Sequence, residues 1–506
     1  MNRLITASML YNLSQCPHRL FLDVHGDPGK KDPESSFLRL LWEKGTEYEK
    51  GVVEGLNMPF VDLSARPHEV RERLTLEAMD RGEGLIYSGR IRSGDLLGEP
   101  DLLLRKENGY VAADIKSSSG LKEGTGDPSG GRLKRHYAIQ LSLYTDILEG
   151  LGLSGGRHPF IWDIHGRKIT YNLDMPSGSG SDATLWQLYR MKLDLARRIV
   201  SMEEKTLPAY SSSTCKLCHW NSLCKDMLSL WDDLTLIPEL GRARRDAMHP
   251  RIKTISEFAR ADLADLIRGQ KSVFAGINPG SLRKFHMRAR LLADPQARPI
   301  IKKKPHFPDH DSELFFDIET DPMRDICYLH GFLERKGRDN STTRYRAFLA
   351  QNPDEEGERQ AFAQAWAYVL NSMPCAIYFY SKYEQNWWRK LQKRHPGIAT
   401  EQQIRDMFNP HSALDLYYGV VVPCTEWPTT DHSIKTLANY LGFRWRDESP
   451  SGADSIEWYH RWTLMGDESV KQRILAYNED DCIATMVVLD GIRGLCGKRQ
   501  ELLPCP

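Results

Sequence analysis

The pattern of hydrophobic and polar positions divides the chain into four stretches. In the first, residues 1–228, helix-like segments such as 37–56 are mixed with short apolar runs at 102–105, 110–115 and 158–163. Apolar positions that recur every three to four residues indicate an amphipathic helix, whereas short apolar runs bounded by turns are typical of buried strands. The first stretch is therefore predicted to be an α/β domain.

The other three stretches follow in order along the chain. Short amphipathic helices are predicted at 255–267 and 281–292, within a helical stretch that covers residues 229–293. Residues 294–311 are rich in proline and charge, a composition typical of a linker. Residues 312–506 open on an apolar strand and then alternate between strands and helices. The pattern therefore predicts a second α/β domain and a multidomain α/β protein.

Composition is that of an ordinary globular protein, and it limits the partners that can be inferred. At 506 residues the chain is too long for one hydrophobic core. Lys and Arg total 68, as do Asp and Glu, so a nucleic-acid partner has to be argued from a local basic patch. We find no signal peptide and no apolar run of about 18 residues, so we expect a cytoplasmic protein without membrane partners. We also find no phosphate-binding G-x-x-x-x-G-K-S/T motif, so we expect no ATP hydrolysis.

A carboxylate pair and a lysine occur together in the sequence GEPDLLLRKENGYVAADIKSS. A turn separates two strand-like runs, which predicts a β-hairpin. Asp101 opens the first strand, and Asp114 and Lys116 close the second, where residues two apart point to the same face. Two carboxylates beside a lysine can bind Mg²⁺ or Mn²⁺ and orient a water molecule against a phosphodiester. The alternative is a hairpin whose charges are merely solvated.

Support for the catalytic interpretation comes from the following helix, HYAIQLSLYTDIL. Gln140 and Tyr144 are four residues apart in it and therefore share one helix face. The basic residues Arg132, Lys134 and Arg135 precede them. Together with the hairpin, this spacing favours a catalytic site over a solvated turn.

Four cysteines form a second candidate site. The chain has 10 cysteines, too few and too unevenly spaced for a disulfide scaffold, which favours reduced thiols or metal ligands. Cys215, Cys218 and Cys224 lie together in CKLCHWNSLC, and Cys16 lies near the start of the same domain. Zinc is the usual ion for closely spaced cysteine and histidine, and His219 is a further potential ligand. An all-cysteine set drawn from both ends of one domain also suits a [4Fe–4S] cluster, and four unlinked buried thiols are the remaining alternative.

These residues resemble those of the RecB-like nucleases of the PD-(D/E)xK superfamily, in particular the iron–sulphur branch found in AddB and in CRISPR-adaptation nucleases. The resemblance covers roughly residues 5–228 and implies a restriction-endonuclease-like fold. It implies metal ligands at Asp101 and Asp114, a catalytic lysine at Lys116, a supporting motif at Gln140 and Tyr144, and cluster ligands at Cys16, Cys215, Cys218 and Cys224. One departure is Glu49, which stands where many members carry a histidine metal ligand, although a carboxylate can also bind Mg²⁺.

A third candidate site consists of acidic residues in the C-terminal half. An apolar strand ends in LFFDIETD, which places Asp317 and Glu319 on one face. The sequence AYNEDDCIATMVVL is predicted to be a helix in which Tyr477 and Asp481 are adjacent. Such acids can hold two Mg²⁺ ions about 3.5–4 Å apart, and the tyrosine hydroxyl can position the attacking water. Acids at a solvated strand end are the alternative.

This half resembles the DEDD 3′–5′ exonucleases of the ribonuclease-H-like superfamily over residues 312–495. By that resemblance Asp317 and Glu319 form the first motif, and Asp481 with Tyr477 forms the last. The middle motif of the family supplies an aspartate, whereas this chain has Glu384 in YSKYE, with Asp415 and Asp480 as alternatives.

The helical stretch resembles a helix–hairpin–helix DNA-binding element around GINPGSLRKFHMRARL. The region that follows the turn is locally basic and contains only one acid, Asp294. Its basic residues are Arg283, Lys284, Arg288, Arg290, Arg298, Lys302, Lys303 and Lys304. Such a patch can bind a nucleic-acid backbone without sequence preference, and a solvated helix face with a charged linker is the alternative.

The whole chain resembles a bacterial family in which a RecB-like nuclease is fused to a ribonuclease-H-like exonuclease. We therefore expect hydrolysis of phosphodiester bonds with Mg²⁺ or Mn²⁺, on DNA rather than RNA and from ends or in single strands. Because Glu49 and Glu384 depart from the family patterns, a nucleic-acid-binding scaffold with one or both sites inactive is a second hypothesis. A zinc-stabilised RNA-processing nuclease is a third.

Overall fold

The computed structural model describes five stretches of the chain: 3–56, 58–122, 132–178, 182–447 and 451–497. The chain forms two compact units, which comprise residues 1–227 and 228–506. Within the five described stretches, we find no helix that is both long and apolar enough to cross a membrane.

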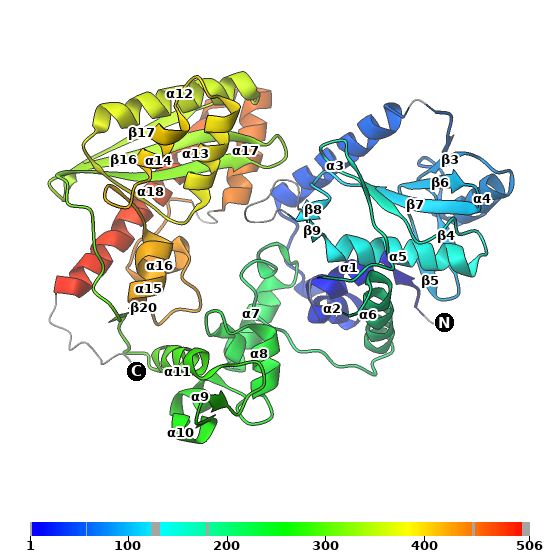
Figure 1. Cartoon of the computed structure of the whole chain (residues 1–506), viewed down its shortest axis with the longest axis horizontal. Helices are drawn as coiled ribbons and strands as arrows, with labels where there is room; N and C mark the ends of the chain where they lie inside the picture. Colours follow the sequence, from blue (N-terminus) through cyan, green and yellow to red (C-terminus); the bar gives the residue numbers. More distant parts are fainter. Residues whose placement is uncertain (1–2, 57, 123–131, 179–181, 448–450, 498–506) are drawn as a thin grey trace. The chain divides into compact units, whose positions relative to one another are not determined.

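A mixed sheet forms the centre of the first unit (Figure 1). In order across the sheet, its strands are β11 Lys168–Thr170, β10 Phe160–Trp162, β7 Gly109–Ile115, β6 Leu102–Lys106, β3 Leu85–Tyr87 and β2 Val61–Asp62. Strands β6 and β7 are antiparallel, which confirms the predicted hairpin. Strand β7 also pairs in parallel with β10, so the hairpin lies in the middle of the sheet.

The first unit also contains helices and two smaller sheets. The helices are α1 Ala7–Gln15, α2 Pro17–His25, α3 Ser36–Glu54, α4 His68–Asp80, α5 Arg135–Gly150, α6 Leu185–Val200 and α7 Asn221–Leu230, which ends in the second unit. One small sheet joins β1 Ile5–Thr6, β5 Leu96–Gly98 and β4 Ile91–Ser93, and the other pairs β8 Leu121–Lys122 with β9 Arg132–Leu133. The helix predicted at 37–56 is α3, and the strands predicted at 102–105, 110–115 and 158–163 are β6, β7 and β10.

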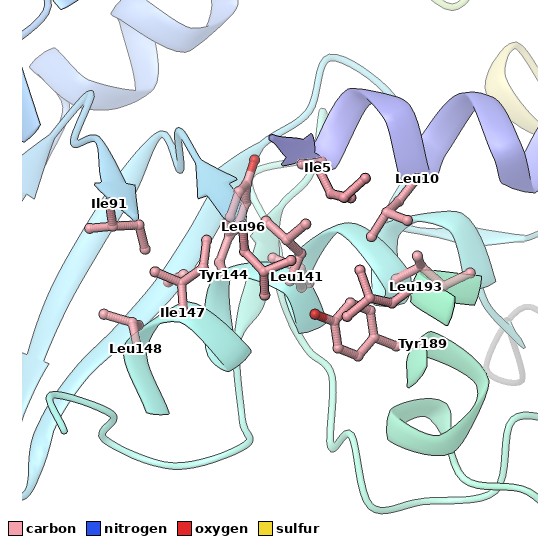
Figure 2. Close-up of a cluster of buried hydrophobic side chains, with 14 of the residues drawn as sticks. Ile5, Leu10, Ile91, Leu96, Leu141, Tyr144, Ile147, Leu148, Tyr189 and Leu193 are labelled. Carbon is pink, nitrogen blue, oxygen red and sulfur yellow. The ribbon is translucent and has the colours of Figure 1, made fainter. Parts of the chain in front are cut away.

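The main core of the first unit lies around α5. Its apolar residues recur at helical spacing and are buried against α1, α6 and the small sheet, as Figure 2 shows. The labelled members are Leu141, Tyr144, Ile147 and Leu148 of α5, with Ile5, Leu10, Ile91, Leu96, Tyr189 and Leu193 around them. Tyr144 is thus held by the core, which fixes the direction of its side chain.

The second unit begins with a helical segment. Its elements are α8 Gly241–Met248, α9 Ile255–Arg260, α10 Leu263–Leu266, a hairpin of β12 Ile267–Arg268 and β13 Lys271–Ser272, and α11 Pro279–Ala293. The continuous helix predicted at 255–267 is therefore wrong. The chain breaks after Arg260 because Asp262 caps a new short helix, its side chain accepting from the backbone N of Ala264 at 2.9 Å. The helix predicted at 281–292 is α11.

Residues 294–311, predicted to be a linker, make specific contacts with the C-terminal part of the unit. Strand β14 Ile300–Ile301 pairs antiparallel with β20 Thr425–Glu426. Nearby, Arg288 Nε donates to Glu426 Oε2 at 2.7 Å, and both side chains are at most 1% exposed. The proposed role of Arg288 in a surface patch is therefore wrong, because its charge is buried against Glu426.

A second mixed sheet forms the C-terminal part of the unit. Its strands, in order, are β17 Asp339–Leu349, β16 Ile326–Lys336, β15 Ser312–Asp321, β18 Ala376–Phe379 and β19 Ala413–Asp415. The first three are antiparallel neighbours, and β15, β18 and β19 are parallel. The helices of this part are α12 Glu355–Ser372, α13 Tyr383–Arg394, α14 Glu401–Met407, α15 Val422–Cys424, α16 Ile434–Tyr440, α17 Gly452–Met465 and α18 Glu468–Gly497, and a π-helix spans Tyr417–Val421.

Side chains of β15 alternate between two environments, as expected for a strand. Leu314, Phe316 and Ile318 belong to a hydrophobic core that includes residues of α12 and α13. Asp317 lies on the other face, where the side chain of Asn478 from α18 donates to it. The strand therefore covers a core with one face and presents carboxylates to α18 with the other.

Candidate active sites

The first site lies at the end of the β6–β7 hairpin. Asp101 immediately precedes β6, and Asp114 is near the end of β7 and only 1% exposed. The backbone N of Ile115 donates to Asp101 Oδ2 at 2.7 Å, and the backbone N of Asp101 lies 3.5 Å from Asp114 Oδ1. The two carboxylates are therefore held beside each other by the sheet itself.

Lys116 completes this arrangement. Its Nζ lies 2.9 Å from Asp114 Oδ2, and its backbone N donates to the carbonyl of Trp162 on β10. Burial lowers the pKa of Lys116, but the charges of Asp114 and Asp101 outweigh it and raise the pKa above the usual range. Burial and the charge of Asp114 raise the pKa of Asp101 well above its usual range. The lysine is therefore a cation, and the paired acids repel each other.

Three more residues named from the sequence surround the hairpin. Glu49 of α3 accepts a hydrogen bond from the hydroxyl of Tyr87 at 2.9 Å, and its charge further raises the pKa of Asp101. On α5, Gln140 Nε2 donates to the Tyr144 hydroxyl at 3.1 Å. Burial raises the pKa of Tyr144, and the charges of Asp114 and Asp101 add to this rise. Glu49 and Tyr144 thus lie near the acids of the hairpin, and Gln140 is hydrogen-bonded to Tyr144.

The second site brings together acids from β15 and α18. Asp317, Glu319 and Asp481 each offer a carboxylate oxygen, and these oxygens all lie within 4.8 Å of one another. Burial raises the pKa of each acid, and for Asp317 and Glu319 the charge of Asp481 adds to the rise. The pKa of Glu319 reaches about 8. Carboxylate oxygens that crowd and repel one another in this way suit a divalent cation.

Side chains that the sequence interpretation missed hold these acids. Asn478 Nδ2 donates to Asp317 Oδ2 at 2.6 Å, and Trp445 Nε1 donates to Asp481 Oδ1 at 2.8 Å. Lys435 Nζ lies 3.1 Å from the Tyr477 hydroxyl and lowers the pKa of all three acids by its charge. Asn478 directly follows Tyr477, and Lys435 lies in SIKTLANYLGF, which is similar to a stretch in many DEDD exonucleases, so both had a usable signal, whereas Trp445 had none.

The acids and Tyr477 line a cavity of about 300 Å³. Thr320, Pro322 and Tyr383 also line it, as do Gly452 and Ile456 of α17. Burial raises the pKa of the Tyr477 hydroxyl well above its usual range, and the charge of Asp481 adds to this rise. Tyr477 is therefore a neutral phenol that can donate a hydrogen bond within the cavity.

Three acids were candidates for the middle motif, and the structure places them differently. Glu384, on α13, is buried, and its charge raises the pKa of Asp317. Asp415 receives backbone hydrogen bonds at the end of β19 and raises the pKa of Glu384 by its charge. Asp480 is bound by the backbone and side chain of Arg446 at 2.8 and 2.9 Å. Glu384 is thus electrostatically coupled to the acid group, whereas Asp480 is engaged by an arginine.

Two family models match the chain. Residues 8–225 match the PD-(D/E)XK nuclease superfamily, and residues 314–492 match the RNase_H superfamily. The chain is a fusion of two nuclease-superfamily domains. A search of curated proteins finds no match. The comparisons confirm both superfamily resemblances and the mixed α/β fold of each domain.

In this nuclease fusion three of the four cysteines are neighbours, although they come from opposite ends of the PD-(D/E)XK domain. Cys16 precedes α2, Cys215 begins a short 3-10 helix, and Cys224 lies on α7. Burial raises the pKa of Cys218, and the charges of Cys16 and Cys215 add to this rise, so the three thiols are near neighbours. Cys16, Cys215 and Cys218 are therefore brought together from opposite ends of the domain, and the role of Cys224 stays a prediction.

Hydrogen bonds to Asp23 also join the two ends of the domain. Asp23 Oδ1 of α2 lies 2.6 Å from His219 Nε2 and accepts from Trp220 Nε1 at 2.9 Å. His219 was a potential zinc ligand, but this ring nitrogen is bound to Asp23. In the RNase_H domain an ion pair also joins the two ends, since Arg493 Nη2 of α18 lies 2.7 Å from Glu313 Oε1 of β15.

Proposed function

We propose that the chain is a nuclease that hydrolyses DNA with Mg²⁺ or Mn²⁺ at two sites, acting at ends or in single strands. The observation that carries this proposal is the group formed by Asp317, Glu319 and Asp481, whose oxygens lie within 4.8 Å of one another in a cavity that Tyr477 also lines. Two nuclease superfamilies in one chain support it. Both superfamilies usually use divalent metals.

At the second site, Asp317, Glu319 and Asp481 would hold the metal. When bound, a divalent cation neutralises charge on the phosphate and makes a bound water more acidic. Glu384 stands in place of the family aspartate, and burial raises the pKa of its carboxyl well above the usual range. Tyr477 stays protonated, so it can orient a water molecule by donating a hydrogen bond but does not remove a proton from it. Asn478 keeps Asp317 in place.

At the first site, Asp101, Asp114 and Glu49 would hold the metal. Lys116 is a fixed cation beside Asp114 and can stabilise negative charge that develops on a phosphate. Gln140 and Tyr144 support the hairpin from α5, where Tyr144 also donates to the carbonyl of Glu99 at 3.3 Å. The glutamate at position 49 provides oxygen where a histidine would provide nitrogen, which suits Mg²⁺ or Mn²⁺.

We further propose that the four cysteines hold a [4Fe–4S] cluster. The set is all-cysteine and is drawn from both ends of one domain, which suits such a cluster. His219 Nε2, the other potential zinc ligand atom, is bound to Asp23, which supports the cluster over a zinc site.

The test is a single-turnover assay with end-labelled single-stranded DNA, duplex DNA and RNA, each with Mg²⁺, Mn²⁺ or a chelator. We expect metal-dependent cleavage, fastest on single-stranded DNA, that disappears in an Asp101→Asn, Asp317→Asn double variant. Cleavage that survives in the double variant would refute both sites. Binding without any cleavage in the wild type would establish the scaffold hypothesis instead, and cleavage restricted to RNA would establish the RNA-processing one.

A further inference from the structure

A groove with a volume of about 1000 Å³ lies in the helical segment of the second unit, away from the acids of the second site. It runs along one face of α11, which Figure 1 shows in green next to α9 and α10. Residues 294–302 and Glu426 complete its lining. Leu263, Met287 and Leu291 supply an apolar surface within it.

The groove is lined by more unpaired positive charge than unpaired negative charge. Glu426 is neutralised by the buried guanidinium of Arg288 and by Lys302 Nζ at 2.8 Å. Lys284 is likewise paired with Glu239 at 2.6 Å. Arg283, Arg290 and Arg298 line the groove and are exposed. Within the described part of the chain, none of these three arginines forms an ion pair. Asp294 is the remaining acid of the lining.

The arrangement of these arginines fits an extended polyanion. Arg283 and Arg290 are seven residues apart and so lie on the same face of α11, about 10 Å apart along its axis. A stacked strand rises about 3.4 Å per nucleotide, so this distance corresponds to about three nucleotides. His286 lies between them, and burial lowers its pKa, which leaves it neutral near pH 7. It donates to the carbonyl of Ala261 at 3.0 Å.

We propose that this groove binds the phosphate backbone of single-stranded nucleic acid and holds the strand for the RNase_H domain. The inference rests on the proposed function. Arg283 and Arg290 contact phosphates about three nucleotides apart and Arg298 contacts a further phosphate, while Met287 and Leu291 provide apolar surface for sugars or unpaired bases. A duplex keeps its bases paired inside, so it would leave this apolar surface unused. The groove contacts phosphates, and its apolar surface contacts sugars or bases without forming hydrogen bonds to the base edges. It therefore does not read the nucleotide sequence.

The test compares an Arg283→Gln, Arg290→Gln, Arg298→Gln variant with a control of equal charge change. The control is Arg251→Gln, Lys253→Gln, Arg268→Gln, whose residues are exposed in the same segment but do not line the groove. Binding of labelled 20-nucleotide DNA and RNA strands to the full chain is measured in chelator, so that no cleavage occurs. For three lost contacts the slope of log affinity against log salt should fall by about 2, since each single-strand contact contributes about 0.7.

We expect this loss of slope, with at least tenfold weaker binding, in the groove variant and a wild-type slope in the control. Equal losses in both variants, or none in either, would overturn the proposal. Wild-type protein that binds poly-glutamate but no oligonucleotide would also overturn it, in favour of an acidic protein partner. Binding is measured without metal and so does not depend on cleavage. A chain that binds through the groove but never cleaves would refute the proposed nuclease function without contradicting nucleic-acid binding by the groove. The DNA and RNA arms decide which strand it prefers.

Discussion

Lys435 Nζ lies 3.1 Å from the hydroxyl of Tyr477 and 4.9 Å from the centre of its ring. The lysine lies in the first turn of α16 and the tyrosine in the N-terminal half of α18, so two helices meet at this contact. The ammonium group fixes the hydroxyl that faces the acids and lowers the pKa of Asp317, Glu319 and Asp481. It therefore links the position of the tyrosine to the charge of the metal site.

The first prediction concerns this contact. Lys435→Met should reduce kcat of the second site by roughly a hundredfold, the cost of misplacing a reacting group by about 1 Å. It should also raise the Mn²⁺ concentration needed for half-maximal activity and shift the acidic limb of the pH–rate profile to higher pH, because the acids hold their protons more tightly. Lys435→Arg should restore most of the metal affinity. A purely structural role for Lys435 would lower activity without moving the pH profile, and this outcome would contradict the assignment.

The second prediction separates the two domains by their chemistry. Lys116→Ala should lower the cleavage that depends on the first site roughly a hundredfold to a thousandfold, because a fixed charge near the phosphate is lost. Oligonucleotide binding and the Asp317-dependent cleavage should stay near the wild-type level. Lys106→Ala, at the exposed far end of the same hairpin, is the matched control. If Lys116→Ala cuts at the wild-type rate in an Asp317→Asn background, the hairpin is not an active site.

The third prediction concerns the cysteines. Protein purified without oxygen should be brown and contain about four irons per chain, as a cubane cluster would. Cys218→Ala should lose the iron and lower the melting temperature of the PD-(D/E)XK domain, whereas Cys496→Ala, in α18 of the other domain, should change neither. One zinc per chain and no iron in elemental analysis would contradict the cluster and show that the cysteines hold zinc. Asp23 hydrogen bonds should keep the domain partly folded without metal.

The fourth prediction is a pH dependence of stability. His330 is fully buried and accepts a hydrogen bond from Trp388 Nε1 at 3.2 Å, and burial lowers its pKa to about 3. The unfolded chain therefore takes up a proton below about pH 6.5 that the folded chain does not. Stability from this residue is present above pH 6.5 and falls by about 2 kcal/mol between pH 7 and pH 5. His330→Asn should flatten this decline in urea unfolding, and an unchanged decline would mean that His330 is not buried in the neutral form.

Local patterns determined much of what the sequence revealed. The β6–β7 hairpin followed from a turn between two apolar runs, and Asp317 and Glu319 share a face because strand side chains alternate. The positions of Tyr477 and Asp481 on one helix face followed from helical spacing in the same way. These predictions depend only on the period of the backbone, which a short segment fixes by itself.

Only the tertiary structure decided which distant side chains meet. Nothing near Arg288 indicated that it would be buried against Glu426, because the partner lies 138 residues away. The same holds for Trp445, which donates to Asp481 from a position 36 residues away that no pattern marked. A charge has the same sequence signature on a solvated face and in a buried pair. Its role depends on the packing of the elements that bring a partner to it.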